Sequence, residues 1–271
     1  MKRAWILILV ALLAGAKFGY DYFYFDTNKR DQYVEKITPT TQQVSPLIRA
    51  VEFPQSSPPI PSNLEVQSAL NSIAIPAGVS DGKLGPRTRQ GLCIWRELTG
   101  RQVDRNLPID IERYAITNAA NYLAKYGEKY SPFDLSKMDD SYVVGLNINK
   151  TCQSAIWIKD ETRKNYLVTI VSTGMPGLDS DSGTFKVGWK VNRWYESIAY
   201  PDGWMYRPLF YNRGQAVHGS EYDSYVWWYP ASHGCVRMLG KDIDALWAAG
   251  FGVGDLVHVY GTWSPTTNDP V

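Results

Sequence analysis

The sequence predicts an α+β protein, in which a mainly antiparallel β domain follows a small N-terminal helical module. Between residues 63 and 126, apolar side chains recur at the spacing of helices that bury one face. From residue 142 onward, short runs of β-branched and aromatic residues alternate with Gly, Asp and Asn turns, which is typical of strands. No long helix separates these runs, so a parallel α/β sheet is disfavoured.

The first 16 residues are predicted to be a signal peptide or membrane anchor. Two basic residues precede an apolar run over 4–16, and Ala14-Gly15-Ala16 fits the small residues of a cleavage site. This run is shorter than the ~20 apolar residues that span a bilayer, although the aromatic stretch 18–25 keeps an uncleaved anchor open. We expect export to the periplasm or cell envelope, with a membrane tether at the N-terminus if the segment is retained.

Shifts in composition divide the rest of the chain into five parts. Residues 17–62 are polar and end in a proline-rich run, which predicts a flexible tether. We expect a helical module over 63–110, a helical connector over 111–140, a β domain over 141–261 and a short tail over 262–271.

The module is predicted to be helix, turn and helix. Apolar spacing at Leu64, Val66 or Gln67, and Leu70 indicates the first helix. The glycines and proline of 80–86 indicate a tight turn. Thr88 is then expected to be the N-cap of a second helix. That helix presents an apolar side made of Leu92, Trp95 and Leu98, and a third helix is expected from Ile109 to Tyr126.

Residues of the turn and of the second helix form a pattern of glycines, a proline, a threonine and a tryptophan. These residues are Asp81-Gly82, Gly85-Pro86, Thr88, Gly91-Leu92 and Trp95. They are similar to the Asp-Gly-x-x-Gly-Pro-x-Thr pattern of small peptidoglycan-binding modules, which implies that residues 63–110 bind the wall polymer. Gly91 stands where those modules usually carry Ala, and Arg96 where they carry Gln. An ordinary turn between ordinary helices is the alternative.

The β domain is predicted from four strand-like runs, at 142–148, 155–158, 167–171 and 185–191. One helix is expected near 241–249.

The net charge of the chain excludes a global attraction for nucleic acid. Lys plus Arg total 28 and Asp plus Glu 27, which leaves a net charge of only +1.

The chain has three cysteines, so at least one of them is unpaired. Cys93 and Cys152 could form a disulfide, but nothing in the sequence sets the distance between them.

The strongest chemical signal is Ser232-His233-Gly234-Cys235-Val236-Arg237. A cysteine is a nucleophile as its thiolate, so an imidazole must take its proton, and His218 lies on the preceding segment. Gly234 allows a substrate carbonyl to approach backbone N–H groups that can hold an oxyanion. These are the elements of acyl transfer through a thioester.

His218, a spacer and Ser232-His233-Gly234-Cys235 resemble the signature of the L,D-transpeptidase (YkuD-type) catalytic domain. Residues 171–174, 182–185 and 205–208 are similar to further stretches of that family. The resemblance runs from about residue 142 to 261 and implies an L,D-transpeptidase-like β-sandwich.

The resemblance also implies roles for individual residues. Cys235 would be the nucleophile, His218 its proton acceptor and donor, and the Gly219 carbonyl would orient the His218 ring. His233 and Gly234 would line the oxyanion side. Substrate would be bound by Ser232, Arg237, Met205 and Tyr206.

The implied reaction needs no metal or organic cofactor. A tetrapeptide stem of peptidoglycan acylates the cysteine, and an amine of another stem resolves the thioester to a 3→3 cross-link. Water as acceptor would give an L,D-carboxypeptidase, and a lipoprotein amine an anchoring enzyme.

Three alternative interpretations of the cysteine motif and of the protein stay open. The first is a non-catalytic peptidoglycan-binding protein. The second is a zinc site at His218, His233 and Cys235, which has suitable ligand types but poor spacing. In the third, Cys235 and His218 simply pack in the core. The aromatic stretch 222–229 could wall the substrate groove or merely pack, and His258, on an expected final strand, is interpreted as structural.

Overall fold

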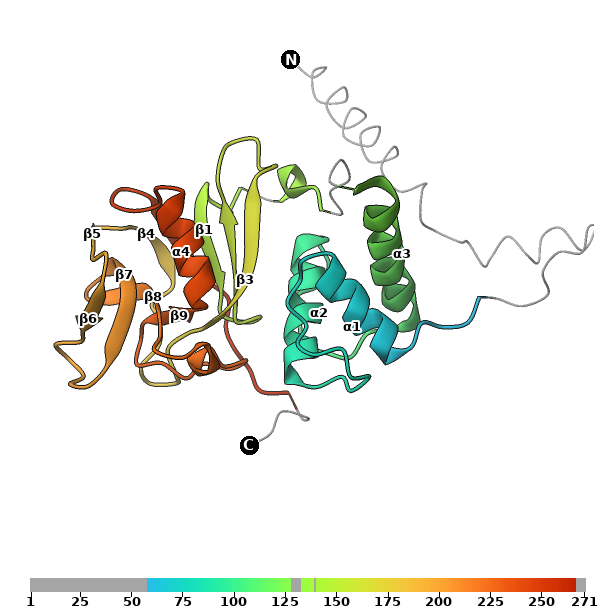
Figure 1. Cartoon of the computed structure of the whole chain (residues 1–271), viewed down its shortest axis with the longest axis horizontal. Helices are drawn as coiled ribbons and strands as arrows, with labels where there is room; N and C mark the ends of the chain where they lie inside the picture. The colour runs from blue at the N-terminus through green and yellow to red at the C-terminus, as the bar shows by residue number, and fades with distance from the viewer. Residues whose placement is uncertain (1–57, 128–132, 139, 267–271) are drawn as a thin grey trace, which may run out of the picture. The chain divides into compact units, whose positions relative to one another are not determined.

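The computed structural model describes residues 58–127, 133–138 and 140–266 (Figure 1). The expected signal segment and nearly all of the expected tether lie outside them, so these remain predictions. Within the described residues, no helix combines the length and apolar character needed to cross a membrane. The described chain is α+β, as the sequence predicts, with helices first and a sheet after them.

Three helices form the N-terminal module, namely α1 (Asn63–Ser72), α2 (Pro86–Leu98) and α3 (Asp110–Tyr126). A capping box of Ser62 and Glu65 begins α1, because each side chain satisfies a backbone N–H of the other. Val66, Leu92 and Ile116 are fully buried in one shared core. The predicted boundary after residue 110 therefore falls at the first residue of α3, whose apolar side belongs to the core of α1 and α2.

The second helix begins two residues earlier than expected, and Thr88 is not its N-cap. Gly85 holds that position and Pro86 follows, where a missing N–H costs nothing. The Thr88 hydroxyl instead accepts a hydrogen bond from Gln67 Nε2 at 3.0 Å and donates to the carbonyl of Ala77 at 3.2 Å. Thr88 thus ties α2 to α1 and to the chain between them.

Gly91 has a packing reason to differ from the alanine of similar modules. A Cβ at this position would lie 3.0 Å from the Cβ of Ala77 and 3.1 Å from its Cα. The glycine therefore lets α2 approach the chain at Ala77 closely. Leu64, which belongs to the apolar spacing that predicts the first helix, faces solvent instead and is 48% exposed.

The β domain contains a ten-stranded sheet in the order β4-β10-β1-β2-β3-β9-β8-β7-β5, with β6 paired to β7. Its strands are β1 (Gly145–Asn149), β2 (Ser154–Ile158), β3 (Tyr166–Ser172), β4 (Gly183–Lys186), β5 (Trp189–Lys190), β6 (Trp194–Glu196), β7 (Trp204–Asn212), β8 (Gln215–Gly219), β9 (Val236–Met238) and β10 (Leu256–Tyr260). Most pairs are antiparallel, as predicted, but β1 pairs with β10 and β8 with β9 in parallel. The single predicted strand 185–191 is two strands, because β4 pairs with β10 and β5 with β7.

Helix α4 (Gly240–Ala248) covers one face of this sheet (Figure 1). Ile243 and Leu246 of α4 are fully buried in a core with Val217 of β8 and Val236 of β9. Two short 3-10 turns, Leu135–Lys137 and Asp223–Tyr225, complete the described elements. This core fixes the backbone of β8 and β9, which matters for the site.

A disulfide between Cys93 of α2 and Cys152 joins the module to the turn between β1 and β2. The pairing that the sequence left open is therefore made, and Cys235 is the free cysteine among the described residues. Glu97 of α2 also reaches the β domain, where its carboxyl oxygen accepts hydrogen bonds from the hydroxyls of Tyr142, at 2.9 Å, and Tyr260.

Candidate active site

The parallel pairing of β8 and β9 places His218 and Cys235 on one face of the sheet. Val217 lies opposite Val236, and His218 lies opposite Arg237. Side chains alternate along a strand, and the two valines are fully buried in the core. His218 and Arg237 must therefore face the opposite side, and Cys235, two residues before Arg237, faces that side as well.

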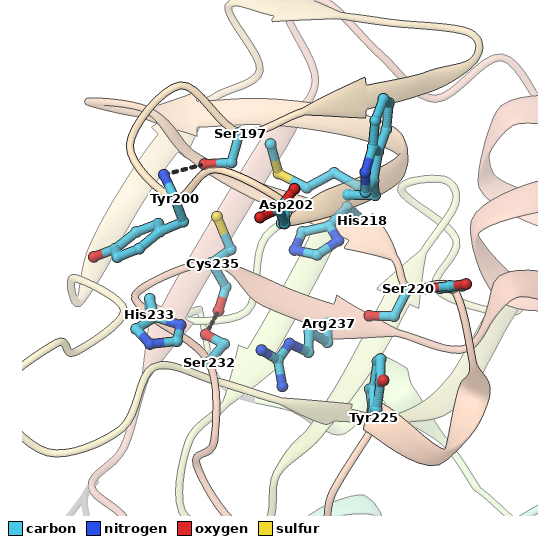
Figure 2. Close-up of a pocket in the computed structure, with 14 residues that line it drawn as sticks. Ser197, Tyr200, Asp202, His218, Ser220, Tyr225, Ser232, His233, Cys235 and Arg237 are labelled. Carbon is cyan, nitrogen blue, oxygen red and sulfur yellow. Dashed lines mark hydrogen bonds between the residues drawn. The ribbon is translucent and has the colours of Figure 1, made fainter.

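A cavity of about 220 Å³ lies over this face (Figure 2). The sequence-predicted residues that line it are Met205, His218, Ser232, His233, Cys235 and Arg237. Tyr206 lies elsewhere, because it lines a neighbouring shallow cleft and donates its hydroxyl hydrogen bond to Asp244 at 3.0 Å. The backbone carbonyls of Gly219 and Gly234 accept hydrogen bonds from His218 and Ser180, and the oxyanion role of Gly234 stays a prediction.

His218 is buried and held in one orientation. Its Nδ1 lies 2.7 Å from the carbonyl oxygen of Gly219, so the ring N–H donates there and Nε2 is left as an acceptor. Burial lowers the pKa of His218 to about 4, and the charge of Arg237 acts in the same direction. The imidazole is therefore neutral at neutral pH and able to accept a proton.

Cys235 is also uncharged at rest. Burial raises the pKa of its thiol, while a backbone hydrogen bond at Ala216 and the positive charge of Arg237 oppose that rise. The Cys235 sulfur donates a long hydrogen bond to the carbonyl oxygen of Gly214, at 4.0 Å. The resting cavity therefore holds a thiol and a neutral imidazole rather than a thiolate-imidazolium pair.

The loop that carries the cysteine is fixed by hydroxyl groups. Ser232 Oγ donates to the carbonyl of Cys235. Ser180, which is fully buried, donates to the carbonyl of Gly234 at 2.9 Å and accepts from the N–H of Gly174 at 3.0 Å. Gly234 has φ +107, a backbone conformation that favours glycine. No pattern in the sequence indicates a role for Ser180, since it lies in a loop outside every motif.

Sequence reasoning also missed one wall of the cavity. The chain between β6 and β7 supplies Ser197, Tyr200, Asp202 and Gly203, with Trp204 at the start of β7. The ring of Tyr200 lies 4.6 Å from the ring of His233 (Figure 2). A loop without regular spacing or a motif gives no sequence signal for such a role.

The aromatic stretch 222–229 both lines the cavity and packs. Tyr225 faces the cavity, whereas Val226 is fully buried in the core that the helical module shares with β2 and β3. His258 on β10 lies away from the cavity, with Nδ1 2.8 Å from Thr184 Oγ1. Among the described residues, no three His, Cys, Asp or Glu side chains are grouped as metal ligands would be.

A buried imidazole with a fixed tautomer on β8 and a free cysteine just before β9 lie at one cavity, so the site holds a proton acceptor and a potential nucleophile. Residues 143–259 match the YkuD family, described as the L,D-transpeptidase catalytic domain. The resemblance that the sequence predicts is confirmed over these residues.

Solved structures are similar to this chain at low sequence identity. An L,D-transpeptidase from Xylanimonas cellulosilytica is 23% identical over 75% of this chain and 100% of its own, with a TM-score of 0.48. One from Stackebrandtia nassauensis is 22% identical over 75% of this chain and 93% of its own, with a TM-score of 0.45. One from Mycobacterium smegmatis is 17% identical over 42% of this chain and 57% of its own, with a TM-score of 0.36. A comparison with curated proteins gave no match.

Proposed function

We propose that the protein is a peptidoglycan L,D-transpeptidase that works through a thioester on Cys235. The observation that carries the proposal is the placement of Cys235 and a neutral, oriented His218 at one cavity of a domain that matches the L,D-transpeptidase family. That match supports a transpeptidase, and the chemistry of the site supports a cysteine as its nucleophile.

The first half of the reaction acylates the enzyme. Cys235 Sγ attacks the carbonyl carbon of the third residue of a tetrapeptide stem as Nε2 of His218 takes the thiol proton. The C–N bond to the terminal D-Ala breaks, and His218 gives the proton to the departing amine. The side chain of Cys235 must turn from Gly214 toward His218 for this step, and such contacts often tighten when substrate binds.

The second half transfers the acyl group. An amine from another stem attacks the thioester carbonyl and gives its proton to His218. The C–S bond breaks, and the sulfur recovers that proton. The product is a 3→3 cross-link when the acceptor is the stem amine. Water as acceptor would release the shortened stem, as in a carboxypeptidase, and a lipoprotein amine as acceptor would attach the lipoprotein to the stem. We propose the stem amine as the main acceptor, and export to the cell envelope as the location where that acceptor is found.

The test is acylation by a carbapenem, whose strained amide reacts with an active nucleophile. Mass spectrometry should show one adduct on the purified chain and none on Cys235→Ala, with circular dichroism unchanged. Cys93 and Cys152 are held in a disulfide, so they do not compete for the reagent. An adduct that survives the substitution would place the nucleophile elsewhere. Incubation with a tetrapeptide stem and an amine acceptor then separates transfer from hydrolysis by product mass.

A further inference from the structure

One face of α2 contacts the catalytic domain through three residues. Arg87 donates a hydrogen bond to the carbonyl of Val226. Gln90 Nε2 donates to the carbonyl of Gln153 at 2.6 Å, and Arg87 Nη1 donates to Gln90 Oε1 at 2.9 Å. Cys93 forms the disulfide with Cys152, the residue before Gln153. Residues spaced by three lie on one side of a helix, so the contacts form one continuous strip.

Gln153, whose carbonyl accepts the hydrogen bond from Gln90, has an unusual backbone conformation. It has φ +52 and is fully buried. A side chain other than glycine in this region costs about 1 kcal/mol or more, so the surroundings must hold it there. Its Oε1 accepts from the N–H of Thr173 at 2.8 Å, and its Nε2 donates to Thr173 Oγ1 at 2.8 Å. Gln153 thus fixes both the backbone and the side chain of Thr173.

Thr173 in turn holds the loop that carries the nucleophile. Its carbonyl accepts from the N–H groups of Ala231 and Ser232, each at 3.0 Å. The carbonyl of Ser232 accepts from Met175 at 2.9 Å, and the Ser232 hydroxyl donates to the carbonyl of Cys235. A continuous series of contacts therefore leads from α2 through Gln153 to the backbone at the nucleophile.

The hydrogen bond from Arg87 of α2 reaches Val226, which lies on the segment between His218 and Cys235. The side chain of Val226 is fully buried in the core that the module shares with β2 and β3. The segment that joins the two residues of the site is thus held twice by the module, once at Val226 and once through Gln153.

We propose that Gln153 is a positioning residue for the nucleophile, and that the helical module holds it in place through Gln90 and the Cys93–Cys152 disulfide. The inference rests on the proposed function. Backbone amides stabilise an oxyanion only when they lie at the right place, and a misplacement of about 1 Å can cost on the order of 100-fold in rate. The module is therefore part of the active site's support, whatever it binds outside.

The test uses Gln90→Ala, which removes a donor from Gln153 without changing the catalytic domain. Glu112→Gln is the matched control, because Glu112 pairs with Arg96 Nη2 at 2.8 Å within the module and has no part in the series. The first-order rate of carbapenem acylation at saturation and the half-saturating concentration are measured for each. Gln90→Ala should lower the rate about 10-fold, with little change in half-saturation, and hydrogen exchange should speed up over 231–235. Glu112→Gln should lower thermal stability but leave the rate unchanged.

Each outcome decides something. If the wild-type chain forms no adduct, the proposed function fails. If the wild-type chain and a folded Gln90→Ala acylate at the same rate, only the positioning role is overturned. If Gln90→Ala does not fold, the measurement moves to the wild-type chain with its disulfide reduced by a phosphine, which leaves Cys235 intact. An unchanged rate there overturns the role, and a slower rate with unchanged half-saturation supports it.

Discussion

At the scale of single residues, burial decides the charge state of the site. The pKa of His218 falls to about 4 because the ring is buried, and the pKa of the Cys235 thiol rises for the same reason. Arg237 lies opposite His218 and contributes a positive charge that lowers both values. The proton must therefore move during the attack, and the neutral imidazole is the form that can take it.

This charge state predicts the pH dependence of acylation. The rate of adduct formation should stay level between about pH 5 and 8 and fall as the pH drops through about 4, where His218 becomes protonated. Stopped-flow or mass-spectrometric rates across this range provide the measurement, with circular dichroism at each pH to exclude unfolding. An acid limb centred near the ordinary histidine pKa of about 6.5 would show that His218 is less desolvated than its burial indicates.

At the scale of elements, the sequence predicted the parts that depend on local pattern. The helices, the strand-like runs and the motif that joins His218 to Cys235 follow from spacing and residue type. The parallel pairs β1–β10 and β8–β9 do not, because they join segments whose partners only the closed sheet brings together. The role of Ser180 and the wall around Tyr200 belong to loops, where position depends on the rest of the fold.

The turn of the module depends on one buried side chain rather than on its glycines alone. Gln67 of α1 is 1% exposed. Its Oε1 accepts from the N–H groups of Asp81 and Gly82, and its Nε2 donates to Asp81 Oδ1, the Lys83 carbonyl and Thr88 Oγ1. The sequence placed Gln67 as an alternative helical core position to Val66, but nothing in the pattern showed that the turn would close around it.

Gln67→Ala should therefore destabilise the module strongly. The N–H groups of Asp81 and Gly82 would lose a part-buried acceptor and the buried Thr88 hydroxyl would lose its donor, and leaving a buried polar group unsatisfied costs about 1–3 kcal/mol. We expect a decrease of about 3 kcal/mol in the free energy of unfolding, measured by urea denaturation. Leu64→Ala on the same helix is the control, since Leu64 is 48% exposed and should change stability by less than about 0.5 kcal/mol. Equal effects of the two substitutions would contradict this role for Gln67.

At the scale of the whole described chain, the module and the β domain are joined by both covalent and polar contacts. The disulfide ties α2 to the turn after β1, and Glu97 of the same helix accepts hydrogen bonds from Tyr142 and from Tyr260 of β10. Buried polar groups of this kind favour one relative placement of two elements, because any other placement would leave them without partners. We therefore expect these contacts between the module and the β domain to contribute to the free energy of unfolding, and the contribution of Glu97 to depend on pH.

Glu97 gives that response a definite sign. Burial raises the pKa of its carboxyl, against the opposing effect of the tyrosine hydrogen bonds. The folded chain then holds a proton that the unfolded chain releases above about pH 4.5, so the stabilisation is complete below that pH and is lost as the pH rises through the folded pKa.

Glu97→Gln keeps an acceptor for both tyrosines and cannot ionise. The difference in unfolding free energy between variant and wild type should be smallest at about pH 4.5, the lower end of the measured range, and grow in favour of the variant by up to about 1.4 kcal/mol per pH unit above it. His218 destabilises both proteins equally as they become acid, so it cancels in the difference. Urea denaturation of both proteins from pH 4.5 to 8 measures it, and a difference that does not change with pH would mean that Glu97 is ionised in the folded protein.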